Sequence, residues 1–269
     1  MTHKVLLITG SNSGIGNATA KLAVQAGYTV YGGARRRETF GAIEAVGAHP
    51  LCIDVTDERS MVEAVRQIEA QHGAVDVLVN NAGFGQMGPV ELVTPEQWQY
   101  QFQTNVFGLV RMAQLVIPAM RARGSGRIFN ISSMGGEFTF PLAGAYHATK
   151  YAVESINEAM RFELKPFGID VITIQPGVVA TPLTQSSAES LQVPADSPYY
   201  SIVSAFQRMS NNLSGFLTPE QVAQVLVQAM QARHPRPRYK IGLMAHALPT
   251  LRGVLGDRMW DRMLGRLYV

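Results

Sequence analysis

Short apolar runs alternate with amphipathic helical patterns along most of the chain. Most of the runs are rich in Val, Ile and Leu, as expected for strands that are buried on both faces of a parallel sheet. Six runs occupy residues 5–9, 29–34, 49–53, 75–79, 127–131 and 170–175, and a short seventh strand is expected at 238–241. Because helical patterns separate these runs, we expect an α/β fold: a doubly wound parallel sheet of about seven strands with helices on both faces.

Two helix starts are marked by side chains that can cap a helix. Thr56 stands where an N-cap is expected, just before a helical pattern. Thr218 has the same place before another helical pattern, and Pro219 follows it at the first helical position. These signals predict a helix after each threonine.

The chain shows no repeat, linker or low-complexity tract, so we expect one domain over residues 1–269. Residues 183–216 mix Ser, Gln, Asn and Pro with apolar residues, which predicts a substrate lid, although an ordinary surface excursion is the alternative. A helical tail is expected at about 245–269. Glycines and aspartates interrupt its apolar row, which favours packing over a substrate pocket or subunit interface rather than on a membrane surface. This row comprises Leu251, Leu255, Met259, Met263 and Leu267.

Composition narrows the possible functions. Of the 269 residues, 46% are hydrophobic and 16% are charged, with a formal net charge of +3. Basic and aromatic residues do not alternate as they do on nucleic-acid surfaces, so no nucleic-acid partner is expected. The one cysteine, Cys52, is predicted to be buried, and neither a disulfide within the chain nor a metal site is expected. The absence of a signal-peptide pattern and of a membrane-spanning run favours a cytoplasmic protein.

A glycine-rich turn follows the first apolar run and precedes a helical pattern. Strand, glycine turn and helix present backbone N–H groups and a helix N-terminus to a pyrophosphate. Gly10 is expected to permit the tight turn, Gly14 the close approach of a phosphate, and Gly16 the packing of the helix on the strand. The order therefore predicts a Rossmann-type dinucleotide site. Its loop reads Thr9-Gly10-Ser11-Asn12-Ser13-Gly14-Ile15-Gly16.

The second strand ends where a dinucleotide fold contacts the adenosine ribose. An acidic residue there would bind the 2′-hydroxyl of NAD, but this chain has Ala34 followed by Arg35, Arg36 and Arg37. A guanidinium group suits the 2′-phosphate of NADP. A solvated basic loop is the alternative for the arginines, yet the missing carboxylate favours NADP independently. NADP(H) is the predicted coenzyme.

Tyr146 and Lys150 lie one turn apart on the same face of a predicted helix. A phenol ordinarily has a pKa of about 10, and an ammonium group one turn away is expected to lower that pKa toward neutrality. A nearby hydroxyl, from Ser132 or Ser133, would steady an oxygen that alternates between carbonyl and alcohol. Because pairs with this spacing also occur by chance on surface helices, the interpretation depends on the coenzyme loop upstream.

Together these motifs resemble the short, single-domain branch of the short-chain dehydrogenase/reductase family over residues 4–241. Residues 9–16 match the family's Thr-Gly-x-x-x-Gly-Ile-Gly pattern. The arginines after the second strand and the uncharged Ser13 are similar to an NADP-preferring subgroup that includes 17β-hydroxysteroid dehydrogenase-like enzymes. The resemblance also implies further cofactor-binding residues: Asp54 and Val55 at the adenine, Asn81, Ala82 and Gly83 beside the cofactor, and Pro176, Gly177 and Thr181 against the nicotinamide.

The resemblance implies a catalytic set of Asn105, Ser133, Tyr146 and Lys150. Ser133, rather than Ser132, has the family's spacing to the tyrosine. Tyr146 would exchange a proton with the substrate oxygen while Ser133 hydrogen-bonds that oxygen. Lys150 would lower the phenol pKa and hold the nicotinamide ribose. Asn105 would position a water between Lys150 and solvent, a role compatible with bracing a bent helix.

The predicted function is hydride transfer between NADP(H) and a carbonyl or secondary alcohol of a fairly lipophilic small molecule. Met134, Phe138 and Phe140 flank the catalytic segment and favour an apolar pocket. The alternatives are a nucleotide-sensing protein without turnover, and a reductase of imines or acyl-chain ketones. Helices expected at 97–120 and 146–164 carry apolar residues on more than one face. In the resembled family such helices pair across a two-fold axis, so a homodimer or homotetramer is expected.

Overall fold

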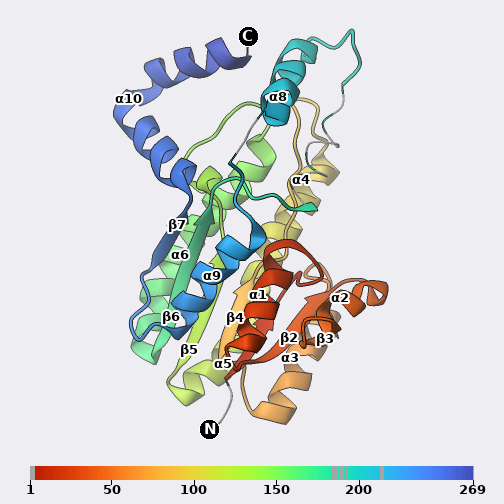
Figure 1. Cartoon of the computed structure of the whole chain (residues 1–269), viewed down its shortest axis with the longest axis vertical. Coiled ribbons are helices and arrows are strands. Elements are labelled where there is room, and N and C mark those ends of the chain that lie inside the picture. Colours follow the sequence, from red (N-terminus) through yellow and green to blue (C-terminus); the bar gives the residue numbers. More distant parts are fainter. Residues whose placement is uncertain are drawn as a thin grey trace.

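Seven parallel strands form one sheet in the computed structural model, which describes residues 4–182, 184, 187, 191, 193–212 and 215–268. The strand order is β3-β2-β1-β4-β5-β6-β7, and Figure 1 shows all strands running toward the same end of the molecule. Every residue of β1 and β4 is buried, because helices cover both faces. The strands are β1 (Val5–Ile8), β2 (Thr29–Ala34), β3 (His49–Cys52), β4 (Val77–Asn80), β5 (Gly126–Ile131), β6 (Ile169–Pro176) and β7 (Arg238–Ile241).

Helices cover the sheet in two layers (Figure 1). On one face α1 and α9 pack together and bury an apolar cluster that includes Ala20 and Leu226. On the other face α3, α5 and the end of α6 bury a second cluster, with Ile68, Met112 and Leu164. The predicted doubly wound architecture is confirmed. The helices are α1 (Gly14–Gln25), α2 (Gly41–Glu44), α3 (Glu58–His72), α4 (Pro95–Phe102), α5 (Gly108–Arg123), α6 (Gly144–Leu164), α8 (Tyr200–Asn212), α9 (Pro219–Gln231) and α10 (Leu243–Tyr268), with short 3-10 turns η1 (Arg37–Thr39), η3 (Met134–Gly136) and η4 (Lys165–Phe167).

One of the two predicted helix caps is right. The Thr218 side chain accepts a 3.3 Å hydrogen bond from the Gln221 N–H at the start of α9. The cap of α3 is Asp57 rather than Thr56. Both the N–H and the hydroxyl of Thr56 donate to Asp54, at 2.9 and 2.7 Å, which holds Thr56 in the turn before the helix.

Two other sequence predictions are wrong. Cys52 is exposed rather than buried, because β3 is an edge strand of the sheet. The helix predicted at 97–120 is interrupted by a π-helical turn, η2 (Gln103–Phe107), between α4 and α5. A π turn accommodates an extra residue in a helix and often marks a functional site. Asn105 lies within this one.

Two helical segments, α8 and α10, project beyond the carboxyl ends of the strands (Figure 1). α8 belongs to the predicted lid, of which residues 183, 185–186, 188–190, 192 and 213–214 lie outside the described part. α10 breaks at Gly256, whose φ of 66° and ψ of 176° are not helical. The predicted apolar row therefore does not form one face: Leu251 and Met259 are exposed, and Leu255 is half-buried. Across the described residues, no helix combines the length and apolar character needed to cross a bilayer.

Candidate active site

Helix α6 places Tyr146 and Lys150 at the carboxyl edge of the sheet. Lys150 is 7% exposed, and its Nζ donates a 2.8 Å hydrogen bond to the Ile131 carbonyl at the end of β5. The same Nζ lies 5.6 Å from the centroid of the Tyr146 ring. The two side chains therefore share one face of the helix, as their spacing predicts.

Ser133 follows β5 and faces the Tyr146 phenol. Its Oγ accepts a 3.1 Å hydrogen bond from the Gly135 N–H, which leaves the Ser133 hydroxyl hydrogen free to donate. The Ser133 hydroxyl lies close enough to the Tyr146 phenol to lower the pKa of Tyr146. The Ser132 hydroxyl, in contrast, is buried and has no partner among the described residues. Ser133 is thus the serine that approaches the tyrosine.

The expectation that Lys150 lowers the pKa of Tyr146 is wrong when only the groups of the protein act on the phenol. Burial raises the pKa of Tyr146 to about 12, against a smaller lowering by Ser133. Burial also lowers the pKa of Lys150 to about 8, opposed by the charge of Glu154. The lysine ammonium points to a carbonyl of β5 instead of to the phenol oxygen. The chain therefore holds Tyr146 protonated at neutral pH.

Asn105 braces two neighbouring segments from its π turn. Its Oδ1 accepts from the Phe84 N–H at 3.1 Å, and its Nδ2 donates to the Phe84 carbonyl at 2.9 Å and to Thr149 Oγ1 at 3.2 Å. Thr149 in turn donates to the Tyr146 carbonyl at 2.6 Å. Within the described residues, Asn105 makes no hydrogen bond to Lys150. Sequence reasoning missed Thr149, although a helical threonine three residues after the tyrosine can bond back to its carbonyl.

Backbone atoms in the glycine loop lie so close to their neighbours that Gly16 and Gly10 have no room for a Cβ atom. A Cβ at Gly16 would lie 2.3 Å from the Gly10 carbonyl oxygen, so helix α1 can approach β1 only with glycine there. Gly10 has a φ of +64°, and a Cβ there would lie 2.9 Å from the Cα of Ala82. Gly14, with a φ of +54°, faces the Thr181 methyl group. The tight turn and the close helix packing predicted for Gly10 and Gly16 are present.

The start of α1 suits a pyrophosphate. The N-cap, Ser13, makes no side-chain capping bond in the described structure, so the first N–H groups of α1 lack an acceptor from that side chain. Ser11 is buried against the Gly33 carbonyl, whereas Asn12, Ser13 and Ile15 keep some exposure. An anion at this helix start would satisfy the free N–H groups.

Hydrogen bonds join the segment after β4 to the glycine loop. Asn81 Nδ2 donates to the carbonyls of Thr9 and Gly10, at 3.0 and 2.7 Å. The Thr9 hydroxyl accepts from the N–H groups of Asn81 and Ala82, both at 3.0 Å. A Cβ at Gly83 would lie 3.1 Å from Asn105 Oδ1. These residues link the coenzyme loop to the π turn.

The predicted adenosine end lies beyond β2 and β3. Arg35 and Arg36 are exposed, and Arg35 donates a 2.7 Å hydrogen bond to the Tyr100 hydroxyl. The Asp54 carboxylate is engaged by Thr56, and Val55 is buried where a Cβ at Gly108 would lie 2.5 Å from the Val55 carbonyl oxygen.

The segment after β6 closes the site from the other side. Gly177 donates a 2.9 Å hydrogen bond to the Ile241 carbonyl of β7, directly after Pro176. A Cβ at Gly14 would lie 3.3 Å from the Thr181 methyl carbon, so Thr181 reaches across to the glycine loop. The structure therefore brings the predicted coenzyme residues from five strand ends to one edge of the sheet.

Comparison with known proteins agrees with this arrangement. The short chain dehydrogenase family model matches residues 4–192. This chain belongs to that family. It is 35% identical over 250 residues to the 3-ketodihydrosphingosine reductase of Bacteroides thetaiotaomicron, covering 92% of this chain and 91% of the relative. It is 30% identical over 267 residues to the NADPH-dependent 3-dehydrocapnine reductase of Ornithobacterium rhinotracheale, covering 96% and 94%. A crystal structure of a short-chain dehydrogenase from Streptomyces avermitilis superposes with a TM-score of 0.82 at 34% identity, covering 99% and 98%.

As a member of the short-chain dehydrogenase family, the chain is an oxidoreductase that uses NAD or NADP. Two apolar clusters of this short-chain dehydrogenase flank Tyr146. One contains Phe140 and joins Tyr146 to α8, and the other contains Phe138 and joins Met134, next to Ser133, to α10. Phe138 contacts Trp260 of α10 edge-to-face at 5.6 Å, and Phe140 stacks on Phe206 of α8 at 6.3 Å.

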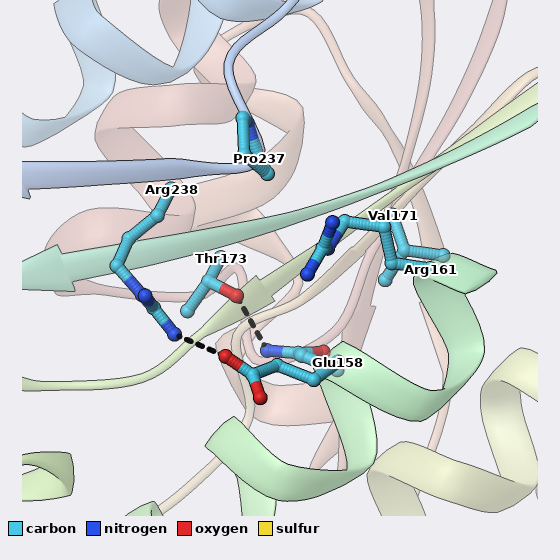
Figure 2. Close-up of a pocket in the computed structure, with 7 residues that line it drawn as sticks. Glu158, Arg161, Val171, Thr173, Pro237 and Arg238 are labelled. Carbon is cyan, nitrogen blue, oxygen red and sulfur yellow. Dashed lines mark hydrogen bonds and ion pairs between the residues drawn. The ribbon is translucent and has the colours of Figure 1, made fainter.

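A separate small pocket opens at the other end of α6 (Figure 2). There Arg238 of β7 pairs with Glu158 of α6 at 3.4 Å, and Asn157 donates to the Thr173 hydroxyl at 2.9 Å. Tyr146 and Ser133 do not line it, so this pocket is distinct from the candidate active site. Its lining residues are Asn157, Glu158, Arg161, Val171, Thr173, Pro237 and Arg238.

Proposed function

We propose that this short-chain dehydrogenase transfers hydride between NADP(H) and a carbonyl or secondary alcohol of a fairly lipophilic small molecule, with Tyr146 as the general acid/base. The observation that carries the proposal is the placement of the Ser133 hydroxyl beside the Tyr146 phenol, with Lys150 Nζ 5.6 Å from the centroid of the same ring. An enzyme that had lost turnover would not need these three groups together. The geometry therefore favours catalysis over nucleotide sensing.

The proposed roles follow from the hydrogen bonds that each side chain can make to a substrate or coenzyme. The coenzyme supplies or accepts the hydride. Tyr146 donates its proton to the substrate oxygen, and Ser133 can donate to the same oxygen because its own Oγ is oriented by the Gly135 N–H. A phenol held protonated suits the reduction direction. Lys150 holds the nicotinamide ribose, and Asn105 keeps the segments around Tyr146 in place and positions a water between Lys150 and solvent.

Three observations support NADP(H) as the coenzyme. Arg35 and Arg36 are exposed beyond β2, Ala34 stands where a carboxylate would repel a phosphate, and one relative is named as NADPH-dependent. Charge-assisted hydrogen bonds to a 2′-phosphate are worth roughly 1.5–3 kcal/mol each, less where solvent screens them. We therefore expect a preference for NADPH of about 10- to 100-fold.

The apolar clusters beside Tyr146 support a lipophilic substrate. Phe138 and Phe140 lie between the catalytic segment and the two projecting helices, so an apolar substrate tail would pass against them. The named reductions of 3-ketodihydrosphingosine and 3-dehydrocapnine by two relatives make acyl-chain ketones the leading compounds to test. Steroid ketones represent the 17β-hydroxysteroid dehydrogenase-like subgroup that the sequence resembles.

The test is kcat/KM for a panel of these ketones, simple aldehydes, a cyclic imine and secondary alcohols, each with NADPH and with NADH. Reduction of at least one apolar ketone with a preference for NADPH is expected. Equal values for the two coenzymes would mean that the arginines form only a solvated loop. Coenzyme binding without turnover of any compound would favour the nucleotide-sensing alternative.

We also propose a homodimer or homotetramer in the cytoplasm. Exposed aromatic side chains lie on the helices that the sequence marked for pairing: Phe107 is 55% exposed in the π turn, and Tyr151 and Phe162 are 45% and 67% exposed on α6. A second copy would cover this surface. Light scattering at micromolar concentration should give a mass above that of one chain; a monomeric mass would contradict the proposal.

A further inference from the structure

Helix α6 continues below the tyrosine and lysine with two carboxylates at the same four-residue spacing. Glu154 lies one turn beyond Lys150, and Glu158 lies one turn further. Glu154 is only 7% exposed. A buried carboxylate is costly unless it is paired and hydrogen-bonded, so its surroundings must stabilise the charge.

Two neighbours hold the Glu154 carboxylate in place. Gln175 of β6, which is fully buried, donates from Nε2 to one oxygen at 2.9 Å. Arg238 of β7 donates to the other oxygen at 2.8 Å. The Arg238 guanidinium extends from the edge strand and also reaches Glu158, as Figure 2 shows. Glu154 thus has both oxygens fixed by strands that do not belong to its own helix.

The other charged groups around Glu154 pair with groups of opposite charge. Gln175 also donates to Glu137 at 2.9 Å, and Glu137 pairs with Lys240 of β7 at 2.7 Å. Glu158 shares Arg238 with Glu154. Lys150 itself donates to the neutral Ile131 carbonyl, so the carboxylate on its own face of α6, at Glu154, is the charge that opposes its desolvation.

We propose that Glu154 is a positioning residue of the active site: its carboxylate, fixed by Gln175 and Arg238, keeps Lys150 charged beside Tyr146 and sets the upper pH limit of hydride transfer. The effect on turnover rests on the proposed function, whereas the charge coupling between Glu154 and Lys150 does not. Glu154 acts through Lys150 and touches no substrate.

Three variants separate this role from a structural one. Glu154→Gln keeps the shape and removes the charge, so Lys150 should lose its proton about one pH unit lower than in the unchanged chain. Arg238→Gln removes the cation that competes for Glu154 and should move the Lys150 titration in the opposite direction. Glu154→Asp keeps the charge, so Lys150 in this variant should titrate at nearly the same pH as in the unchanged chain. Glu163→Gln is the matched control, because Glu163 is exposed on α6 and lies more than three turns from Lys150, and it should leave the titration unchanged.

The primary measurement is the titration of the Lys150 Nζ signal in the full chain labelled with ¹⁵N-lysine, assigned by its loss in Lys150→Met. The second is the pH at which kcat/KM for an accepted ketone falls on the alkaline side. Downward movement in Glu154→Gln and upward movement in Arg238→Gln, in both measurements, supports the proposal. An unchanged Lys150 titration in Glu154→Gln overturns it. If that variant does not fold, an unchanged titration in Arg238→Gln overturns it instead.

The two measurements also separate this inference from the proposed function. If no ketone is turned over, the proposed function fails, and the titration still decides the coupling. If the Lys150 titration moves while the alkaline limit of kcat/KM stays in place, the coupling exists but the role in turnover is overturned.

Discussion

The glycine loop and the two projecting helices are built from different kinds of contact. In the loop, backbone meets backbone: a Cβ at Gly16 would lie 2.3 Å from the Gly10 carbonyl oxygen, and nothing can be added without displacing α1. Helix α10 is held to the site by side chains, chiefly Trp260 against Phe138. It leaves Leu243 and Val254 83% and 79% exposed.

We expect this difference to separate the groups that every turnover would use from the groups that adapt to a particular substrate. The loop and the strand ends hold groups that every turnover would use, and they allow little movement. The projecting helices contact the same site through a few replaceable side chains, so they can adapt to a substrate without disturbing the strand ends. Four variants test this separation.

The largest effect is expected from Tyr146→Phe, in the rigid part. The variant removes the transferable proton and keeps the ring packing, so turnover should fall by about 100- to 10,000-fold. NADPH binding, followed by fluorescence, should change little because the phenol oxygen is the only atom removed. Turnover within a few-fold of the unchanged protein, on every accepted substrate, would exclude Tyr146 as the acid.

The next effect compares two buried aromatic residues, one in each region. Phe129 of β5 is 0% exposed and Trp260 of α10 is 4% exposed. Phe129→Ala should lower the free energy of unfolding by about 3–5 kcal/mol, because it leaves a cavity in the sheet core. Trp260→Ala should leave the main unfolding transition in place and raise KM for an apolar ketone several-fold.

Urea unfolding followed by circular dichroism, with steady-state kinetics on the same samples, checks this pair. An equal loss of unfolding free energy in the two variants would show that α10 folds as one unit with the sheet. The separation of the two regions would then be wrong.

The smallest effect is expected at His147 of α6, which packs against Phe138 and Phe140, the residues that contact the projecting helices. His147 is 3% exposed, donates to or accepts from Thr139, and packs against Phe140 at 4.6 Å. Burial lowers the pKa of His147 from 6.5 to about 4. Below pH 6.5 the unfolded chain therefore binds a proton that the folded chain excludes, and stability falls as the pH falls toward 4.

Between pH 7 and pH 5.5 this linkage should cost about 1 kcal/mol of unfolding free energy. His147→Gln cannot bind the proton, so its stability should fall less over the same interval, while all other groups titrate alike. Urea unfolding at the two pH values measures the difference. The same fall in both proteins would mean that His147 does not titrate in this range.

Much of the fold can be predicted from the sequence, because the hydrophobic pattern of each strand or helix is local. Continuous apolar runs predict strands that are buried on both faces, and β2 and β7 have the predicted bounds. Which strand lies at the sheet edge is not local information, and Cys52 was therefore placed wrongly. The π turn was missed for a related reason, because its residues read as an ordinary helix.

The candidate site was predictable where spacing alone brings groups together. Tyr146 and Lys150 share a helix face, as their spacing predicts, whereas Ser133, the serine that reaches the phenol, was selected over Ser132 only by the family resemblance. The pKa of Tyr146 was predicted in the wrong direction, because burial raises this pKa by more than the Ser133 hydroxyl lowers it. Thr149 and Glu154 were missed because their partners, Asn105, Gln175 and Arg238, come from other elements.

The π turn between α4 and α5 has a consequence for insertions, deletions and chimeras. Because the π turn accommodates one extra residue, deleting one residue from 103–107 would restore a regular α-helix and leave the rotation of α5 nearly unchanged. Adding a further residue there would instead rotate α5 by about 100° and turn Met112, Val116 and Met120, now fully buried, out of the core. Residues 103–107 should therefore tolerate the loss of one residue better than the gain of one. A chimera that exchanges this helix with a relative should take residues 94–123 as one piece, keeping the Thr94 cap of α4 and the bulge together.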